Sequence, residues 1–217
     1  PTIGLSWDEF IILFDDIVSQ NREHITVRPE LGLARETDDI FWRENAAKAL
    51  AAGYFQSIDL YGDELAHEIS HFTQYLQEAK NQGLKIKIHS GEVGSASRVL
   101  HEYEQFQPNA IQHGIRTAED DAVLSTLAAS NVTFNVCPAS NVALRVVDDY
   151  ASHPVAAMIR AGMKVTINTD DYAIFGTSLS DEYLRLFQTG LLTASELEIV
   201  RQNGLKENPQ TPRILNE

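Results

Sequence analysis

Short apolar runs alternate with longer amphipathic stretches along almost the whole chain. Six of the apolar runs predict strands, which lie within residues 24–35, 54–64, 84–92, 109–115, 132–141 and 164–171. In residues 24–35 and 132–141 the strand is predicted to come first and a loop to follow it. A stretch with the helical spacing of apolar residues follows each one. A strand followed by a helix, repeated six times, is typical of a parallel sheet with helices packed against it.

Helix signals mark the segments between these strands. Ser6 predicts the N-cap of an opening helix that continues to Ser19, with acidic residues in its first turn. Gly53 is a natural end for a helix that begins near residue 36. Further helices are predicted at residues 65–82, 95–106, 118–131, 153–162 and 179–205.

The chain has no low-complexity linker, internal repeat or break in composition, so residues 1–217 are predicted to form a single domain. The predicted fold class is α/β, and its pattern resembles that of a (β/α)8 barrel of the TIM type. Such a barrel typically needs about 250 residues, so this chain is shorter by about one or two βα units.

Composition limits the classes of partner. The net charge is −14, which repels nucleic acid and anionic membranes. No apolar run approaches the ~18 residues of a membrane helix, and the first ten residues lack the features of a signal peptide. The single cysteine, Cys137, excludes an internal disulfide and favours a reducing, cytoplasmic location.

Residues that can ligate a metal or move a proton follow almost every predicted strand. In parallel α/β proteins the carboxyl ends of the strands share one edge, where functional side chains gather. A purely structural protein has no need of so many titratable groups there. The residues at these positions are Asp59 and Gly62, His89 and Glu92, His113, Cys137 with Ser140 and Asn141, and Asp170 with Asp171.

Three of these sites have competing interpretations. His89 and Glu92, in HSGE, could be a metal ligand and a proton-transferring carboxylate, or a capping glutamate beside an incidental histidine. His113 could equally be a buried core histidine. The like charges of Asp170 and Asp171 destabilise each other unless a cation or a hydrogen-bond donor compensates, so one could bind metal and the other substrate, or they could cap a helix.

The remaining candidates are predicted to be structural. His67 and His71 are spaced for one helical face, but no third ligand accompanies them, so we expect a surface position. His24, His101 and His153 are expected to be peripheral, with His153 capping the helix that follows it. Cys137 is expected to be a packed thiol at a strand end.

Five motifs in order resemble the adenosine deaminase family of the amidohydrolase superfamily. They are DLYGDE (59–64), HSGE (89–92), QHG (112–114), NVCPASN (135–141) and NTDDYAIF (168–175), and the resemblance covers roughly residues 24–205. It implies a (β/α)8 barrel with one zinc ion at its carboxyl rim, and hydrolytic deamination of a purine nucleoside, with adenosine favoured.

The resemblance also implies a role for each matching residue. His89 and Asp170 match zinc ligands. Glu92 matches the residue that protonates the purine N1, and His113 matches the one that orients the attacking water and helps to deprotonate it. Gly62 and Asp171 match substrate contacts, Gly62 through its backbone and Asp171 at N7 of the purine.

The sequence departs from the family pattern in ways that affect these expectations. Ser90 stands where the family has a small apolar residue, Gln112 replaces a glycine and Tyr172 replaces a common proline. No His-x-His occurs in the 217 residues, although the family takes two zinc ligands from one at the end of its first strand. We therefore expect an incomplete barrel of about six βα units that lacks the first two.

Such a barrel has consequences for function. It exposes strand edges and apolar lining, which favours self-association through the open edge. With two of the three or four ligands that zinc needs, the isolated chain is expected to bind zinc weakly and to deaminate poorly.

Other functions remain open. The substrate could be adenine or a modified adenosine nucleotide, or the chain could be a non-catalytic remnant that binds a purine or a protein. Another metal-dependent hydrolase on the same barrel is disfavoured because the strand ends carry Asp59 and Asp170 but no bridging lysine. The zinc cytidine-deaminase fold is excluded, because it needs two cysteines for its zinc.

Overall fold

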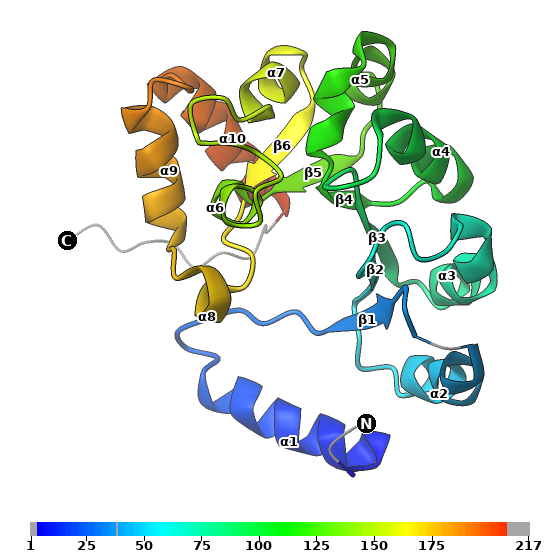
Figure 1. Ribbon diagram of the computed structural model, residues 1–217. Coiled ribbons are helices and arrows are strands. Elements are labelled where there is room, and N and C mark those ends of the chain that lie inside the picture. Colours follow the sequence, from blue (N-terminus) through cyan, green and yellow to red (C-terminus); the bar gives the residue numbers. More distant parts are fainter. Residues whose placement is uncertain (1–3, 38, 208–217) are drawn as a thin grey trace. The chain divides into compact units, whose positions relative to one another are not determined.

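The computed structural model describes residues 4–37 and 39–207, and Figure 1 shows alternating strands and helices along them. Six strands form one sheet in which they follow the order of the sequence, β1 to β6. The strand pairs β1–β2, β4–β5 and β5–β6 are parallel. This is the architecture of a partial (β/α)8 barrel with six βα units, and it confirms the predicted fold class.

The chain divides into two compact units, residues 1–87 and 88–217, and the boundary falls within strand β3. The assignment of residues 1–217 to a single domain stays a prediction.

The first unit contains an opening helix and the first two strands. Its elements are α1 (Trp7–Gln20), β1 (Glu30–Ala34), α2 (Asp39–Ala51), β2 (Ser57–Tyr61), the 3₁₀ helix η1 (Ile69–Phe72), α3 (Thr73–Asn81) and the first half of β3 (Lys85–Ser90). Its core is formed by apolar side chains of both strands and of the helices over them. The most completely buried are Leu33, Leu60, Ala49, Phe72, Leu76 and Ala79.

The second unit continues from β3 with three further strands and the helices between and after them. Its elements are α4 (Ala96–Phe106), β4 (Ala110–His113), η2 (Ile115–Glu119), α5 (Asp121–Ala128), β5 (Thr133–Val136), α6 (Pro138–Ala143), α7 (Val155–Arg160), β6 (Lys164–Ile167), α8 (Tyr172–Phe175), α9 (Leu179–Gln188) and α10 (Ala194–Glu207). Its core lies where the strands meet these helices, at Ile88, Val99, Ile111, Phe134, Val165, Met158, Leu186 and Val200.

Side-chain caps fix where several helices begin, as the sequence indicated. The Ser6 hydroxyl accepts the backbone N–H of Glu9, whose carboxylate accepts the N–H of Ser6, so both halves of a capping box are present. Ser178 forms the same reciprocal pair with Asp181 at the start of α9, whereas the Asp120 carboxylate caps α5 by accepting the Ala122 and Val123 N–H groups. Gly53 takes a φ of 64° just after α2, which confirms the predicted helix end.

Three local predictions are corrected. Within residues 24–35 only Glu30–Ala34 form a strand, because pairing with β2 starts at Glu30 opposite Ser57. Residues 65–82 are not one helix but a turn, η1 and α3. The segment after β5, predicted as a loop, is the short helix α6, which starts at Pro138, where proline's missing N–H costs no hydrogen bond.

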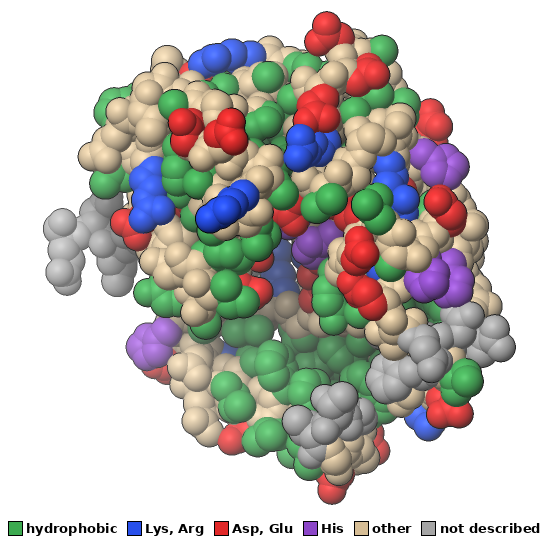
Figure 2. Space-filling model, viewed as in Figure 1, with side chains coloured by type: hydrophobic (Ala, Val, Ile, Leu, Met, Phe, Trp, Pro, Cys, Tyr) green, Lys and Arg blue, Asp and Glu red, His purple; other side chains and the backbone are tan. Residues whose placement is uncertain are grey.

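Helix α1 packs through one aromatic face. Phe10 and Phe14 stack at 6.0 Å between ring centroids, and Phe14 meets the Tyr54 ring edge-on at 6.2 Å. Its exposed side carries apolar residues among the acidic ones, since Ile12 and Ile17 are exposed, and green side chains gather over this helix in Figure 2. The opening helix is therefore amphipathic only in part.

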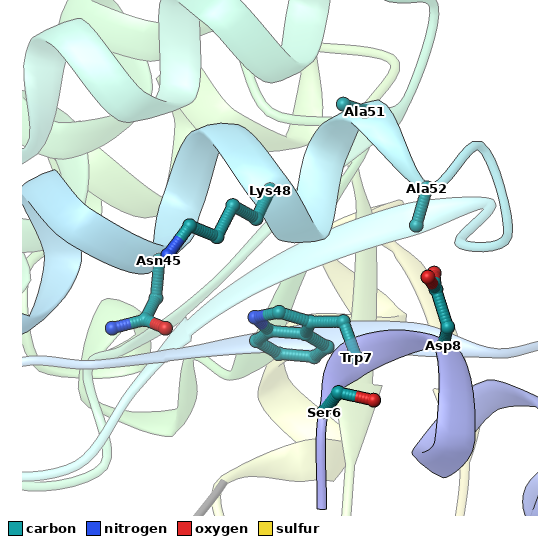
Figure 3. Close-up of a pocket in the computed structure, with 7 residues that line it drawn as sticks. All are labelled: Ser6, Trp7, Asp8, Asn45, Lys48, Ala51 and Ala52. Atoms are coloured by element: carbon teal, nitrogen blue, oxygen red, sulfur yellow. The ribbon is translucent and has the colours of Figure 1, made fainter.

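A pocket of about 510 Å³ lies between α1 and α2. Figure 3 shows the Trp7 indole beneath α2, with Lys48 above it. The pocket is lined by Ser6, Trp7, Asp8, Asn45, Lys48, Ala51 and Ala52, none of which is a predicted site residue. Within the described part of the chain, no helix is long and apolar enough to cross a membrane.

The turn after β4 generates a test of the fold. Gly114 has a φ of 66°, and a Cβ there would collide with the Phe134 ring. We expect Gly114→Ala to lower the free energy of unfolding by about 2–4 kcal/mol, because backbone strain adds to overpacking. Urea denaturation followed by circular dichroism measures it.

Gly162→Ala is the matched control. Gly162 also has a positive φ, 88°, but no described atom lies within 4 Å of its Cβ position. In this variant the free energy of unfolding should fall only by the cost of the left-handed backbone, about 1–2 kcal/mol. Equal losses in the two variants would contradict the close contact between Gly114 and Phe134.

Candidate functional site

Four of the predicted site residues lie in the second unit at the carboxyl ends of its strands. His89 is next to last in β3, Glu92 follows β3, His113 ends β4 and Asp170 follows β6. The structure brings them together through His113, which is buried with 3% of its surface exposed. Its ring centroid lies 5.3 Å from that of His89, and its Nδ1 lies 3.5 Å from the Glu92 Oε1.

Asp170 reaches the same place from β6. Potential ligand atoms of His113, Cys137 and Asp170 all lie within 4.8 Å of one another, and Asp170 is the exposed member of the three. Imidazole, thiol and carboxylate groups are the ligands that zinc prefers. Together with His89 beside His113, this edge of the sheet concentrates the donors that a divalent cation needs.

The backbone is strained at two of these residues. His113 has a φ of 61° and Asp170 a φ of 57°, and only two other non-glycine residues of the described chain, Gln107 and Arg145, have a positive φ. A left-handed backbone costs a side chain about 1–2 kcal/mol. Such strain clusters at functional sites, where the surrounding structure holds the residue in place.

Arg116 holds the loop that carries Glu92. Its backbone N–H donates to the Gly91 carbonyl at 2.9 Å, and its Nε donates to the Glu92 carbonyl at 3.3 Å. The same guanidinium donates to the Val146 carbonyl at 3.4 Å. The loop after β3 is thus tied to the segments after β4 and α6.

Cys137 is a packed thiol, as predicted. It is buried, and burial, followed by the negative charges of Asp170, Glu182 and Glu92, raises its pKa far above the usual range. A thiol in this state is uncharged at neutral pH, so it is a poor nucleophile.

Two site residues were underestimated from the sequence. Asn141, in α6, is fully buried, and its Nδ2 donates to the Glu92 Oε1 at 2.7 Å. His153 caps α7, as predicted, by accepting the Val155 N–H, but it is buried rather than peripheral and reaches the Asn141 Oδ1. The HP dipeptide predicted the cap, but no local pattern signals the contact with α6.

Helix α6 is anchored by a buried carboxylate. The Glu182 Oε1 accepts the Ala139 N–H at 3.0 Å, and its Oε2 accepts the Tyr150 hydroxyl at 3.2 Å. Burial raises the pKa of this carboxyl group. Glu182, on α9, therefore fixes the start of the helix from which Asn141 projects.

The two residues predicted to contact the substrate, Asp171 and Gly62, lie in different units. Asp171 is exposed, its N–H donates to the Asp170 Oδ1 at 3.0 Å, and its carbonyl accepts the first hydrogen bonds of α8. Gly62 lies in the first unit, at the end of β2, with a φ of 98°. A Cβ there would collide with the Glu36 carboxylate, which accepts the Asp63 N–H, so this turn requires glycine.

His67 and His71 lie at the surface of the first unit, as predicted. Their rings stack with centroids 4.7 Å apart. They belong to a turn and to η1 rather than to one face of an α-helix.

Comparison with known proteins places these features in a family. The family model for adenosine deaminase matches residues 3–210. A Treponema pallidum protein, provisionally assigned as an adenosine/adenine deaminase, is 35% identical over 88% of this chain and 64% of its own length. A Rhizobium meliloti adenine deaminase is 36% identical over 68% of this chain and 46% of its own.

A solved structure agrees with these sequence relatives. The adenine deaminase of Arthrobacter aurescens superposes with a TM-score of 0.82 at 29% identity, over 90% of this chain and 60% of that one. The chain thus spans about half to two thirds of the length of the proteins that it matches.

Ser90, the departure within HSGE, generates a test of this site. It is buried, and its hydroxyl has no hydrogen-bond partner among the described residues. Because a buried unsatisfied hydroxyl is destabilising, Ser90→Ala should raise the free energy of unfolding by about 1 kcal/mol. Thermal or urea denaturation measures it.

Ser178→Ala makes the same chemical change at a serine whose hydroxyl is hydrogen-bonded. The Ser178 hydroxyl accepts the Asp181 N–H at 3.2 Å at the start of α9, so its loss should lower stability. The expected loss is about 1 kcal/mol, opposite in sign to the effect at Ser90. A loss of stability in Ser90→Ala would show that its hydroxyl is bonded after all.

Proposed function

The chain belongs to the adenosine deaminase family, and on that premise we propose that it carries the acid–base part of a site that hydrolytically removes the amino group of a 6-aminopurine. The observation that supports this most is the contact of His113 with both Glu92 and His89, beside Asp170. These four residues come from three strand ends, those of β3, β4 and β6, and each matches a family motif.

A zinc ion suits the donors at this edge. His89 and Asp170 would hold it, since an imidazole and a carboxylate are common zinc ligands. When bound, the ion supplies Lewis-acid activation of water near neutral pH. The 217 residues contain no His-x-His, so the two further ligands expected for the family are not supplied by this sequence.

In this proposal the chain's own residues protonate the purine and position the attacking water. Glu92 would protonate the purine N1, which reduces the aromatic stabilisation of the ring as water attacks C6. His113, buried beside it, would orient the attacking water. Asp171 and the backbone of Gly62 would contact the purine, and these two contacts rest on the resemblance of their motifs.

Adenosine and adenine are the two candidate substrates. The adenosine deaminase family model favours adenosine, with inosine and ammonia as products. Adenine is the second candidate, because the Rhizobium meliloti and Arthrobacter aurescens relatives are adenine deaminases. A cytoplasmic location and self-association through an open sheet edge remain part of the proposal.

Zinc titration of the isolated chain tests the metal site. We expect weak binding, with a further loss in Asp170→Asn and no change in Asp149→Asn, an exposed aspartate that caps its own turn through Ser152. Isothermal titration calorimetry measures both. Tight one-to-one zinc binding by the isolated chain would contradict the assignment of only two ligands to it.

The deamination itself is tested by ammonia release from adenosine and from adenine. The chain alone should be slow, and adding a polypeptide that ends a strand in His-x-His should restore turnover. Glu92→Gln should then lower kcat by about 10²- to 10⁴-fold, because a general acid is lost. No ammonia from either purine in the combined protein would favour a non-catalytic remnant.

A further inference from the structure

A single backbone N–H sets the direction of a chain of buried hydrogen bonds. The N–H of Val155 can only donate, and it donates to the His153 Nδ1 at 3.1 Å. The Nδ1 of His153 is therefore an acceptor without a proton. Burial lowers the pKa of His153 to about 4, so the ring is neutral near pH 7 and its one proton is on Nε2.

This tautomer fixes which way the Asn141 amide points. The Nε2–H of His153 needs an acceptor, and the Asn141 Oδ1 lies 3.3 Å from it. The amide oxygen of Asn141 therefore faces His153, and its NH₂ group faces the other side. Since Asn141 is fully buried, water cannot compensate for the reversed orientation.

The NH₂ group of Asn141 has two protons and meets two acceptors. Its Nδ2 lies 2.7 Å from the Glu92 Oε1 and 3.3 Å from the His113 Nδ1. Each contact uses one proton. The His113 Nδ1 must then present its lone pair, which leaves the ring proton of a neutral His113 on Nε2.

We propose that Asn141, oriented by His153, is a positioning residue that keeps His113 in its Nε2–H tautomer and directs any proton of the Glu92 carboxyl group to Oε2. The inference deepens the proposed function and rests on it for its catalytic meaning. Glu92 could then donate from Oε2 while Oε1 is held by the amide.

The tautomer changes the role of His113. A ring nitrogen that carries a proton cannot ligate a metal or accept a proton. His113 would therefore orient the attacking water as a hydrogen-bond donor and would not deprotonate it, which differs from the role that the family resemblance implies. His113 is therefore not a metal ligand through Nε2, although its ring lies within the cluster that includes Cys137 and Asp170. Ligation falls to His89 and Asp170 instead.

The competing arrangement is a proton on the His113 Nδ1, shared directly with Glu92. The distance from this Nδ1 to the Glu92 Oε1 is 3.5 Å, beyond the usual range of an N–H···O bond. A proton there would also point toward the Asn141 NH₂ group at 3.3 Å. The geometry therefore favours the arrangement in which the Glu92 Oε1 and the His113 Nδ1 both accept hydrogen bonds from the Asn141 NH₂ group.

Nitrogen-15 NMR of the histidine rings in the metal-free 217-residue chain tests the inference without any turnover. At pH 8, two-bond ¹H–¹⁵N correlations separate protonated from unprotonated ring nitrogens. We expect His153 and His113 each to show an unprotonated Nδ1 and a protonated Nε2. Exposed His101 is the internal reference, with exchange-averaged tautomers. A protonated Nδ1 on either His113 or His153 would overturn the proposal.

Asn141→Asp tests whether the amide is the cause. Aspartate keeps an acceptor for His153 but removes the protons offered to His113, so His113 should move its proton to Nδ1 or become doubly protonated. His153 should keep its Nε2–H signature, which also shows that the local fold persists. An unchanged His113 spectrum in this variant would contradict a positioning role for Asn141.

Asn135→Asp is the matched control. Asn135, on β5, donates to the Gln112 Oε1 at 2.8 Å and accepts from Thr166, and the structure gives it no bond to His113. It adds the same charge to the same unit and should leave the His113 tautomer unchanged. The same shift in both variants would attribute the effect to charge and overturn the proposal.

These outcomes separate the inference from the proposed function. The tautomers can be as expected in a chain that releases no ammonia, which would reject only the deaminase activity. A different tautomer in a chain that deaminates when completed would reject only the role of Asn141.

Discussion

Parallel pairing of the strands in the second unit is the constraint on which the site depends. β4 pairs with β5 and β5 with β6, so the residues that leave their carboxyl ends share one edge. His113, Cys137 and Asp170 are distant in the sequence, yet their ligand atoms lie within 4.8 Å of one another. The positive φ values of His113 and Asp170 are stabilised by the surrounding sheet and helices, since isolated peptides would relax them.

Burial gives the polar residues at this edge their definite orientations. Burying an amide or an imidazole costs free energy unless each of its donors and acceptors has a hydrogen-bond partner. One N–H of fixed direction can therefore determine the orientation of the next group in the network. In this way helix α7, through Val155 and His153, orients Asn141 on α6. Glu182, on α9, fixes the start of α6 by accepting the Ala139 N–H. The bonds that stabilise these short helices are therefore the ones that arrange the candidate catalytic groups.

The candidate chemistry divides between two pairs of residues. His89 and Asp170 are the proposed zinc ligands. Glu92, the proposed proton donor, and His113, proposed to orient the water, both contact the buried amide of Asn141. The two pairs meet at the His113 ring, which lies 5.3 Å from that of His89. This division explains how adjacent residues such as Asp170 and Asp171 can take different roles: one faces the cluster and the other starts α8.

The sequence by itself determined the alternation of strands and helices, the helix limits at Ser6 and Gly53, and which residues leave the strand ends, because hydrophobic period and capping chemistry are local properties. It misplaced the strand within residues 24–35 and the helix within 65–82, since pairing and packing set those limits. Only the tertiary structure decided the role of Asn141, whose partners Glu92, His113 and His153 lie 49, 28 and 12 positions away. Hydrogen-bond direction in a buried network depends on which groups meet in space, and no local pattern in the chain encodes that.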